Sequence, residues 1–262
     1  MNLAPVAHSD ASTFHRRLLV AMTCLFLFRA EHAVAQPDVV RSPPQEFMGR
    51  TIAPAMHFSG ANWLTRASRE AEEQPQLLLE ELRIAPGQKL CDFGCGNGYY
   101  TLMLARTTGA RGGVWAVDIQ PEMLQLLRER AEPRGLDNIH YVHAAPEDPH
   151  LPQQSLDLVL MVDVYHEIGS PAEVMEKVRD ALKPTGVVAV VEFREEDPSV
   201  PIRPLHKMSK LQVDREFRAH RLKLVRQSDR LPWQHVLWYA RDDSPMVEIP
   251  LETWPPRESE GP

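Results

Sequence analysis

The chain has 262 residues, of which 43% are hydrophobic and 25% are charged, as is typical of a globular protein with one α/β domain. The formal net charge of −7 disfavours a nucleic-acid partner, since proteins that bind DNA or RNA present basic surfaces. The three cysteines have no second Cys/His cluster at ligand spacing, so we predict no metal site and assign Cys91 and Cys95 to packing.

The N-terminus has the pattern of a processing signal. Arg16 and Arg17 precede an apolar run over residues 18–28, and Ala33-Val34-Ala35 follows as a small-residue cleavage site. We interpret residues 1–35 as a secretory signal peptide, which predicts export to the periplasm. The apolar run is too short to span a bilayer, so no stable membrane insertion is expected after its removal. If the leader is not used, the protein would be cytoplasmic.

Three further segments follow the leader. Residues 36–59 are rich in proline and polar residues and are expected to form a flexible arm. The domain itself is expected over residues 60–241, beginning with a helix over residues 67–82. Residues 242–262 contain five prolines and are expected to form a disordered tail.

Strand-like and helix-like segments alternate through this domain. The predicted strands are residues 89–93, 113–118, 138–143, 156–162, 186–193, 222–228 and 234–240. The predicted helices between them are residues 98–107, 121–131, 171–182 and 209–219. Short connections between alternating strands and helices predict an α/β fold with a doubly wound, mostly parallel, Rossmann-like sheet of seven strands and helices on both faces.

A glycine-rich turn follows the first strand of the domain. Gly94, Gly96 and Gly98 alternate after Asp92, and a helix-like pattern begins at once. Glycines at such a turn let the backbone approach a ligand closely. The dinucleotide fingerprint G-x-G-x-x-G would need its third glycine at Tyr99, and Asp92 would repel a pyrophosphate. The turn therefore favours a ligand with a cationic centre.

A second acid follows the next strand. Asp118 ends the run Gly113–Val117, about twenty residues after the glycine turn. A carboxylate at this place accepts both hydroxyls of a ribose in nucleotide-binding βαβ units. Together, the turn and Asp118 predict a ligand that contains adenosine.

The segment from Asp92 to Gly98 resembles the first motif, D/E-x-G-x-G-x-G, of the class I S-adenosylmethionine-dependent methyltransferases. The resemblance covers about residues 60–240 and implies S-adenosyl-L-methionine as cofactor. It implies that Asp92 holds the methionine end, that Gly94, Gly96 and Gly98 pass under the adenosine, that Asp118 binds the ribose, and that Ile119 packs on the adenine.

The adenine loop departs from the family pattern. Ala145 stands where the family often has an acid, and Pro146 offers no N–H group. Glu147 or Asp148 would have to supply the missing contact. These departures leave open an alternative in which the protein binds S-adenosylmethionine without catalysis.

Acceptor chemistry is expected after the fourth strand. Asp163, His166 and Glu167 would face the transferred methyl group there. His166 is the candidate general base, since its ordinary pKa lies near neutrality, and Asp163 or Glu167 would orient it or bind the acceptor. Asp163 is also a candidate cofactor ligand. The alternative is that His166 only packs against the cofactor and that Glu167 only begins a helix.

Further acceptor contacts are expected from residues 192–194 and 203–208, although a solvated loop is the simpler explanation for Arg203, His206 and Lys207. The resulting hypothesis is an S-adenosylmethionine-dependent methyltransferase that acts on a small molecule. A nicotinamide-dependent oxidoreductase is the alternative from another enzyme class. Methylation of protein or RNA remains an option within the methyltransferase hypothesis.

Overall fold

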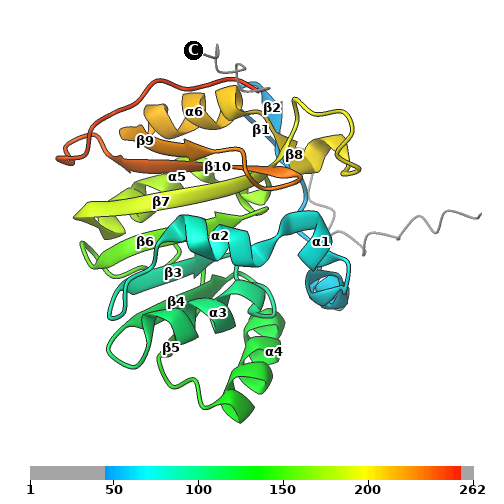
Figure 1. Ribbon diagram of the computed structural model, residues 1–262, viewed down its shortest axis with the longest axis vertical. Coiled ribbons are helices and arrows are strands. Elements are labelled where there is room, and N and C mark those ends of the chain that lie inside the picture. Colours follow the sequence, from blue (N-terminus) through cyan, green and yellow to red (C-terminus); the bar gives the residue numbers. More distant parts are fainter. Residues whose placement is uncertain (1–44, 255–262) are drawn as a thin grey trace, which may run out of the picture. The chain divides into compact units, whose positions relative to one another are not determined.

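The computed structural model describes residues 45–254. Its main sheet has the strand order β5-β4-β3-β6-β7-β10-β9, with β8 paired to β7 (Figure 1). These strands are β3 (Lys89–Phe93), β4 (Gly113–Asp118), β5 (Ile139–His143), β6 (Leu156–Val162), β7 (Leu182–Arg194), β8 (Lys207–Met208), β9 (Leu222–Ser228) and β10 (Gln234–Arg241). All neighbours are parallel except β10, which is antiparallel to both β7 and β9. The predicted fold class is confirmed.

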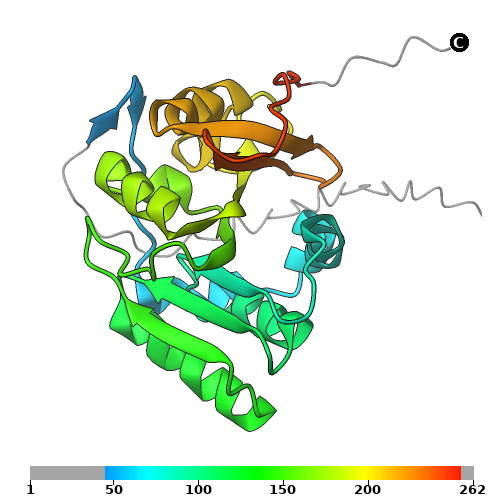
Figure 2. The same cartoon turned by 90° about the vertical axis from the view of Figure 1, so that its left-hand side faces the viewer.

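Helices cover both faces of the sheet (Figure 2). They are α1 (Arg69–Glu73), α2 (Pro75–Leu82), α3 (Tyr99–Thr108), α4 (Pro121–Ala131), α5 (Pro171–Ala181) and α6 (Lys210–Ala219). Short 3-10 helices are η1 (Phe58–Thr65), η2 (Glu132–Arg134), η3 (Tyr165–Glu167) and η4 (Pro204–His206). The apolar residues of α2, α3 and α4 share one core cluster, and those of α5 and α6 share the other.

Alternation along the strands produces these two clusters. In β6, Leu158 and Leu160 belong to the cluster of α2, α3 and α4, whereas Val159 and Met161 belong to the cluster of α5 and α6. Successive side chains of a strand point to opposite faces, so a strand buried on both faces is apolar throughout. This is why residues 156–162 could be recognised from the sequence as a central strand.

The single helix predicted over residues 67–82 is wrong in one respect. The structure divides it into α1 and α2 at Gln74, whose backbone is left-handed with a φ of 46°. Pro75 follows and begins α2, and a proline disfavours the helical conformation in the residue before it. The chain therefore turns at Gln74 instead of continuing straight.

The expected flexible arm is partly folded. Residues 45–59 include an antiparallel hairpin of β1 (Glu46–Phe47) and β2 (Arg50–Thr51). From β2, the Arg50 guanidinium lies 2.7 Å from a carboxylate oxygen of Glu216, whose side chain is fully buried in α6. Because Arg50 and Glu216 are 166 positions apart in the sequence, this ion pair holds the segment against the rest of the domain. A high content of prolines and polar residues does not reveal such a contact. Residues 36–44 and the predicted signal peptide lie outside the described residues.

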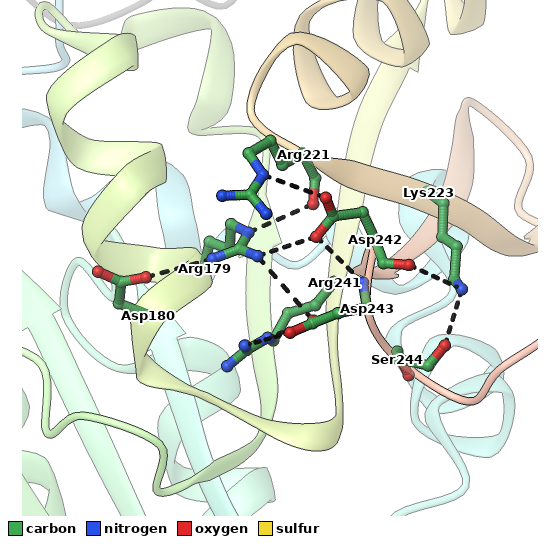
Figure 3. Close-up of polar contacts among 8 residues, drawn as sticks. All are labelled: Arg179, Asp180, Arg221, Lys223, Arg241, Asp242, Asp243 and Ser244. Carbon is green, nitrogen blue, oxygen red and sulfur yellow. Dashed lines mark hydrogen bonds and ion pairs between the residues drawn. The ribbon is translucent and has the colours of Figure 1, made fainter.

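The expected disordered tail is also corrected over residues 242–254. Asp242 accepts hydrogen bonds from Arg179 of α5 at 2.9 Å and from Arg221 at 3.1 Å, and Lys223 donates to the carbonyl oxygens of Asp242 and Ser244 (Figure 3). Further on, the Ile249 N–H group donates to the Leu224 carbonyl oxygen at 2.9 Å. The segment is therefore ordered and runs along β9. Residues 255–262 lie outside the described part of the chain.

Within the described residues, none of the helices combines the length and the apolar character that crossing a membrane requires.

Candidate functional site

A cavity of about 890 Å³ lies at the carboxyl ends of the parallel strands β3, β4 and β6. This is the edge at which ligands bind in doubly wound sheets. Its floor includes Phe93, Gly94, Gly96 and Asp118. Residues 51–58, η1 and η4 also line it, so the arm preceding the domain proper contributes to the wall of the site.

The glycine turn can be formed only without side chains. Gly94 and Gly96 have positive φ angles of 67° and 53°, a backbone region that residues with a side chain rarely adopt. A Cβ atom at Gly94 would collide with the Val164 side chain, and one at Gly96 would lie 2.5 Å from Cδ1 of Leu64. Both glycines line the cavity.

Asp118 connects the end of β4 to the glycine turn. Its Oδ2 atom accepts a hydrogen bond from the Gly96 N–H group at 2.9 Å, and its Oδ1 atom accepts one from the Gln120 N–H group at 2.9 Å. Burial raises the pKa of Asp118 to about 6, although these two hydrogen bonds oppose the shift. Each oxygen of the ionised carboxylate keeps a lone pair for a further donor, so the group fits two ribose hydroxyls. Ile119 beside it is 51% exposed and lines the cavity with an apolar side chain, as adenine stacking requires.

Three of the predicted cofactor residues are not among those that line the cavity: Asp92, Gly98 and Asp148. Asp92 is buried below the turn and accepts a 2.5 Å hydrogen bond from Thr101. A Cβ atom at Gly98 would collide with Leu127, so this glycine permits the packing of α4. Asp92 and Gly98 therefore support the glycine turn and do not line the cavity, whereas the resemblance implied that Asp92 holds the methionine end directly or through water.

The adenine loop is closed on itself. Ala145 and Asp148 exchange backbone hydrogen bonds of 2.9 and 3.2 Å, which places Asp148 in a turn. Glu147 lines the cavity, whereas Asp148 does not. Of the two substitutes considered for the missing acid, Glu147 is therefore the one positioned to meet a ligand.

Asp163 supplies an unpaired acceptor in the wall of the cavity. Its φ angle is 51°, and its Oδ2 atom accepts a 2.8 Å hydrogen bond from Gln234, while the buried Oδ1 atom has no hydrogen-bond partner among residues 45–254. Burial raises the pKa of Asp163 well above its ordinary value, and the negative charges of Glu73 and Glu192 add to this shift. A buried acceptor without a partner is costly, and a cationic ligand would satisfy it. The carboxylate acceptors Asp118 and Asp163 thus fit a cofactor with a ribose and a positively charged amino-acid end.

The polar end of the cavity is built around His166, which is buried in η3. Its Nδ1 atom lies 2.6 Å from a carboxylate oxygen of Glu192, and its Nε2 atom lies 3.1 Å from Nδ1 of His206. Burial alone would lower the pKa of His166, but the Glu192 charge outweighs it and raises that pKa to about 9. This pKa favours the protonated imidazole at neutral pH, which donates hydrogen bonds, whereas the general-base role expected from the sequence needs the neutral form.

The sequence favoured a solvated loop over an acceptor contact for His206 and placed Glu192 only among the acceptor contacts expected of residues 192–194. In the structure, η4 brings His206 against η3, and Glu192, two residues before the end of β7, contacts the imidazole of His166. Glu192 and His206 follow His166 by 26 and 40 positions in the chain, so no local spacing in the sequence reveals that the three side chains meet. The available signal was the position of residues 192–194 at the end of a predicted strand, because ligands of doubly wound sheets bind at the carboxyl ends of the strands.

The sequence model of a family described as "Methyltransferase domain" matches residues 84–236, more than half of the chain. The chain belongs to this methyltransferase family. The resemblance that the glycine motif indicated is confirmed, and with it S-adenosylmethionine as the cofactor of the methyltransferase domain. A structure titled as that of a SAM dependent methyltransferase from Aquifex aeolicus has the same fold, with a TM-score of 0.66 and 23% identity, over 71% of this chain and 98% of that one.

Curated relatives match the methyltransferase domain over shorter stretches. The ubiquinone/menaquinone biosynthesis C-methyltransferase UbiE of Vibrio vulnificus (strain YJ016) is 30% identical over 109 residues, 41% of this chain and 42% of that protein. Aklanonic acid methyltransferase DauC of Streptomyces sp. (strain C5) is 38% identical over 74 residues, 28% of this chain and 34% of that protein. The match thus spans less than half the length of each of these relatives.

Proposed function

We propose that the protein transfers a methyl group from S-adenosylmethionine to a small organic molecule bound in the same cavity. The observation that carries this proposal is the pairing of Asp118 with the Gly96 N–H group, which presents a ribose-binding carboxylate beside a side-chain-free turn. A cavity of about 890 Å³ lies within the range of small-molecule sites and supports a compact acceptor rather than a macromolecule.

S-adenosylmethionine supplies an electrophilic methyl group on a sulfonium centre. The chain supplies binding groups for the rest of the cofactor: Asp118 for the ribose, Ile119 for the adenine and Asp163 for the ammonium group. Each of the three residues lines the cavity. In a displacement of this kind, most of the rate comes from holding the acceptor in line with the methyl group.

The acceptor is held between an apolar wall and a polar end. Ile202 and Leu205 line the cavity on the side of η4, and His166, Glu167 and His206 form the polar end. This arrangement suits a molecule with an apolar body and one polar group to be anchored. UbiE and DauC are named for ubiquinone/menaquinone biosynthesis and for aklanonic acid, which supports a small-molecule acceptor.

The test has two stages. Calorimetry of the full chain should show binding of S-adenosylhomocysteine and none of NADH; the reverse preference would establish the oxidoreductase alternative and refute the proposal. The protein is then incubated with methyl-labelled S-adenosylmethionine and a deproteinised, nucleic-acid-free extract of its host. A labelled compound of low mass, found by mass spectrometry, supports the proposal. Label that enters only protein or RNA in a whole extract contradicts it.

A further inference from the structure

The polar end of the cavity brings together three potential metal ligands. His166, Glu167 and His206 each offer one donor atom, and these atoms all lie within 4.8 Å of one another. We propose that these three side chains bind a divalent first-row transition-metal ion that holds the acceptor. The role of the ion in holding the acceptor rests on the proposed function, whereas the binding of the ion does not.

The distances among the donor atoms fit one central ion. His166 Nε2 lies 3.1 Å from His206 Nδ1, and Glu167 Oε1 lies 3.8 Å from the former and 3.5 Å from the latter. Two ligands at about 2.1 Å from an ion are about 3.0 Å apart at a right angle and about 3.4 Å apart in a tetrahedron. The observed separations bracket the tetrahedral value, so small side-chain movements complete the site.

Glu192 prepares His166 for this role. Its Oε2 atom lies 2.6 Å from Nδ1 of the imidazole, and its side chain is fully buried. Metal-binding histidines regularly donate their second N–H group to a carboxylate, which fixes the tautomer and turns the free nitrogen toward the ion. Here that arrangement directs Nε2 toward His206 and Glu167.

The backbone of this turn is also fixed. The His166 carbonyl oxygen accepts hydrogen bonds from the Ala53 N–H group at 3.0 Å and from Arg50 at 3.1 Å. The His166 N–H group lies 3.3 Å from the second oxygen of Glu192. A ligand held from both sides in this way loses little conformational freedom when it binds an ion.

The donor set selects the kind of ion. Two imidazoles and one carboxylate suit Zn²⁺, Co²⁺, Mn²⁺ or Fe²⁺, whereas Mg²⁺ and Ca²⁺ prefer oxygen ligands throughout. Three protein ligands leave at least one coordination position open. Because the three side chains line the cavity, that position is available to an oxygen atom of the acceptor.

The test uses the untagged full chain after treatment with a chelator. Calorimetry with Zn²⁺ and the visible absorption of Co²⁺ should report one site per chain. Binding should weaken at least about 10-fold in His206→Asn and in Glu167→Gln, and by about 10- to 100-fold in Glu192→Gln, which acts by positioning His166. The two ligand variants concern half-buried side chains, so folding is expected to survive and is checked by circular dichroism.

His150→Asn is the matched control, because His150 lies 3.5 Å from the Asp148 carboxylate on the surface and the described part of the chain offers it no third ligand. It should bind Zn²⁺ like the parent. Equal binding by the parent, His206→Asn and Glu167→Gln, or no binding by the parent, would overturn the inference. S-adenosylhomocysteine binding is measured in parallel: if it is absent while Zn²⁺ binds at this site, the proposed function fails and the metal site stands.

Discussion

Asp118 and Gly96 are joined by a hydrogen bond of 2.9 Å between a carboxylate oxygen and a backbone N–H group. The bond links the ends of two neighbouring parallel strands and fixes the carboxylate at the floor of the cavity. The two strongest features of the sequence, the glycine turn and the acid after the next strand, thus form one unit.

Replacement of this acid tests the unit directly. Asp118→Ala removes the acceptor of two ribose hydroxyls, and hydrogen bonds to a charged group contribute about 1.5–3 kcal/mol each. We expect S-adenosylhomocysteine to bind at least about 10-fold more weakly, measured by calorimetry. Asp148→Ala, outside the cavity, should bind like the parent. Unchanged affinity in Asp118→Ala would refute the assignment of the ribose site.

Cofactor affinity should depend on pH because burial raises the pKa of Asp118 to about 6. The ionised form accepts the ribose hydroxyls, so affinity should fall as the pH drops through 6. Folding stability responds in the opposite direction. A carboxyl group whose folded pKa lies above its unfolded value of 3.8 binds its proton more tightly in the folded state, so its stabilising effect is present below pH 3.8 and is lost as the pH rises to about 6.

The control for this pH dependence is Asp118→Asn, which keeps the shape and removes the titration. Its weaker affinity should vary less between pH 5 and pH 7 than that of the parent. Calorimetric titrations of both proteins in the same buffers measure the difference, and parallel pH profiles would contradict the role given to Asp118.

Gly94 and Gly135 allow the effect of a collision to be separated from backbone strain. Both have left-handed backbones, with φ angles of 67° and 61°, but only at Gly94 would a Cβ atom meet another side chain, that of Val164. Gly135→Ala should cost about 1–2 kcal/mol of unfolding free energy. Gly94→Ala should cost more, because the β-branched valine cannot rotate away easily. Urea denaturation measures both values; equal losses would show that Val164 yields.

The ion pair between Arg50 and Glu216 should matter for stability. Arg50→Ala leaves the fully buried Glu216 carboxylate without its cation, which typically costs about 3–5 kcal/mol. Arg218→Ala is the control, since its partners Asp214 and Glu248 form a more exposed network expected to contribute about 1 kcal/mol or less. Urea denaturation of the two variants should rank them in this order, and the opposite ranking would contradict it.

The sequence predicted those features that local pattern determines. The boundaries of β4 and β6 follow from continuous apolar runs, and Gly94, Gly96 and Asp118 follow from positions at strand ends. The polar end of the cavity was predicted only in part. His166 and Glu167 were found because they follow β6, whereas the approach of His206 depends on how a loop of the chain returns to the sheet.

The structured arm was missed for a related reason. Residues 45–59 have little periodicity, and their order comes from single long-range contacts such as that between Arg50 and Glu216. The break at Gln74 is different, because Pro75 is visible in the sequence and disfavours the helical conformation at the residue before it.

The contact between Arg50 and Glu216 has a consequence for synthesis on the ribosome. The glycine turn and Asp118 can meet once the first two core strands have emerged. The Arg50 side chain, which donates to the His166 carbonyl oxygen, is held by Glu216, and these two partners are separated by 166 positions in the sequence. Contacts so distant along a chain form late, after the intervening elements are in place. A nascent chain would therefore complete the part of the site that binds the nucleoside first, and would stabilise the polar end of the cavity only after Glu216 has left the ribosome.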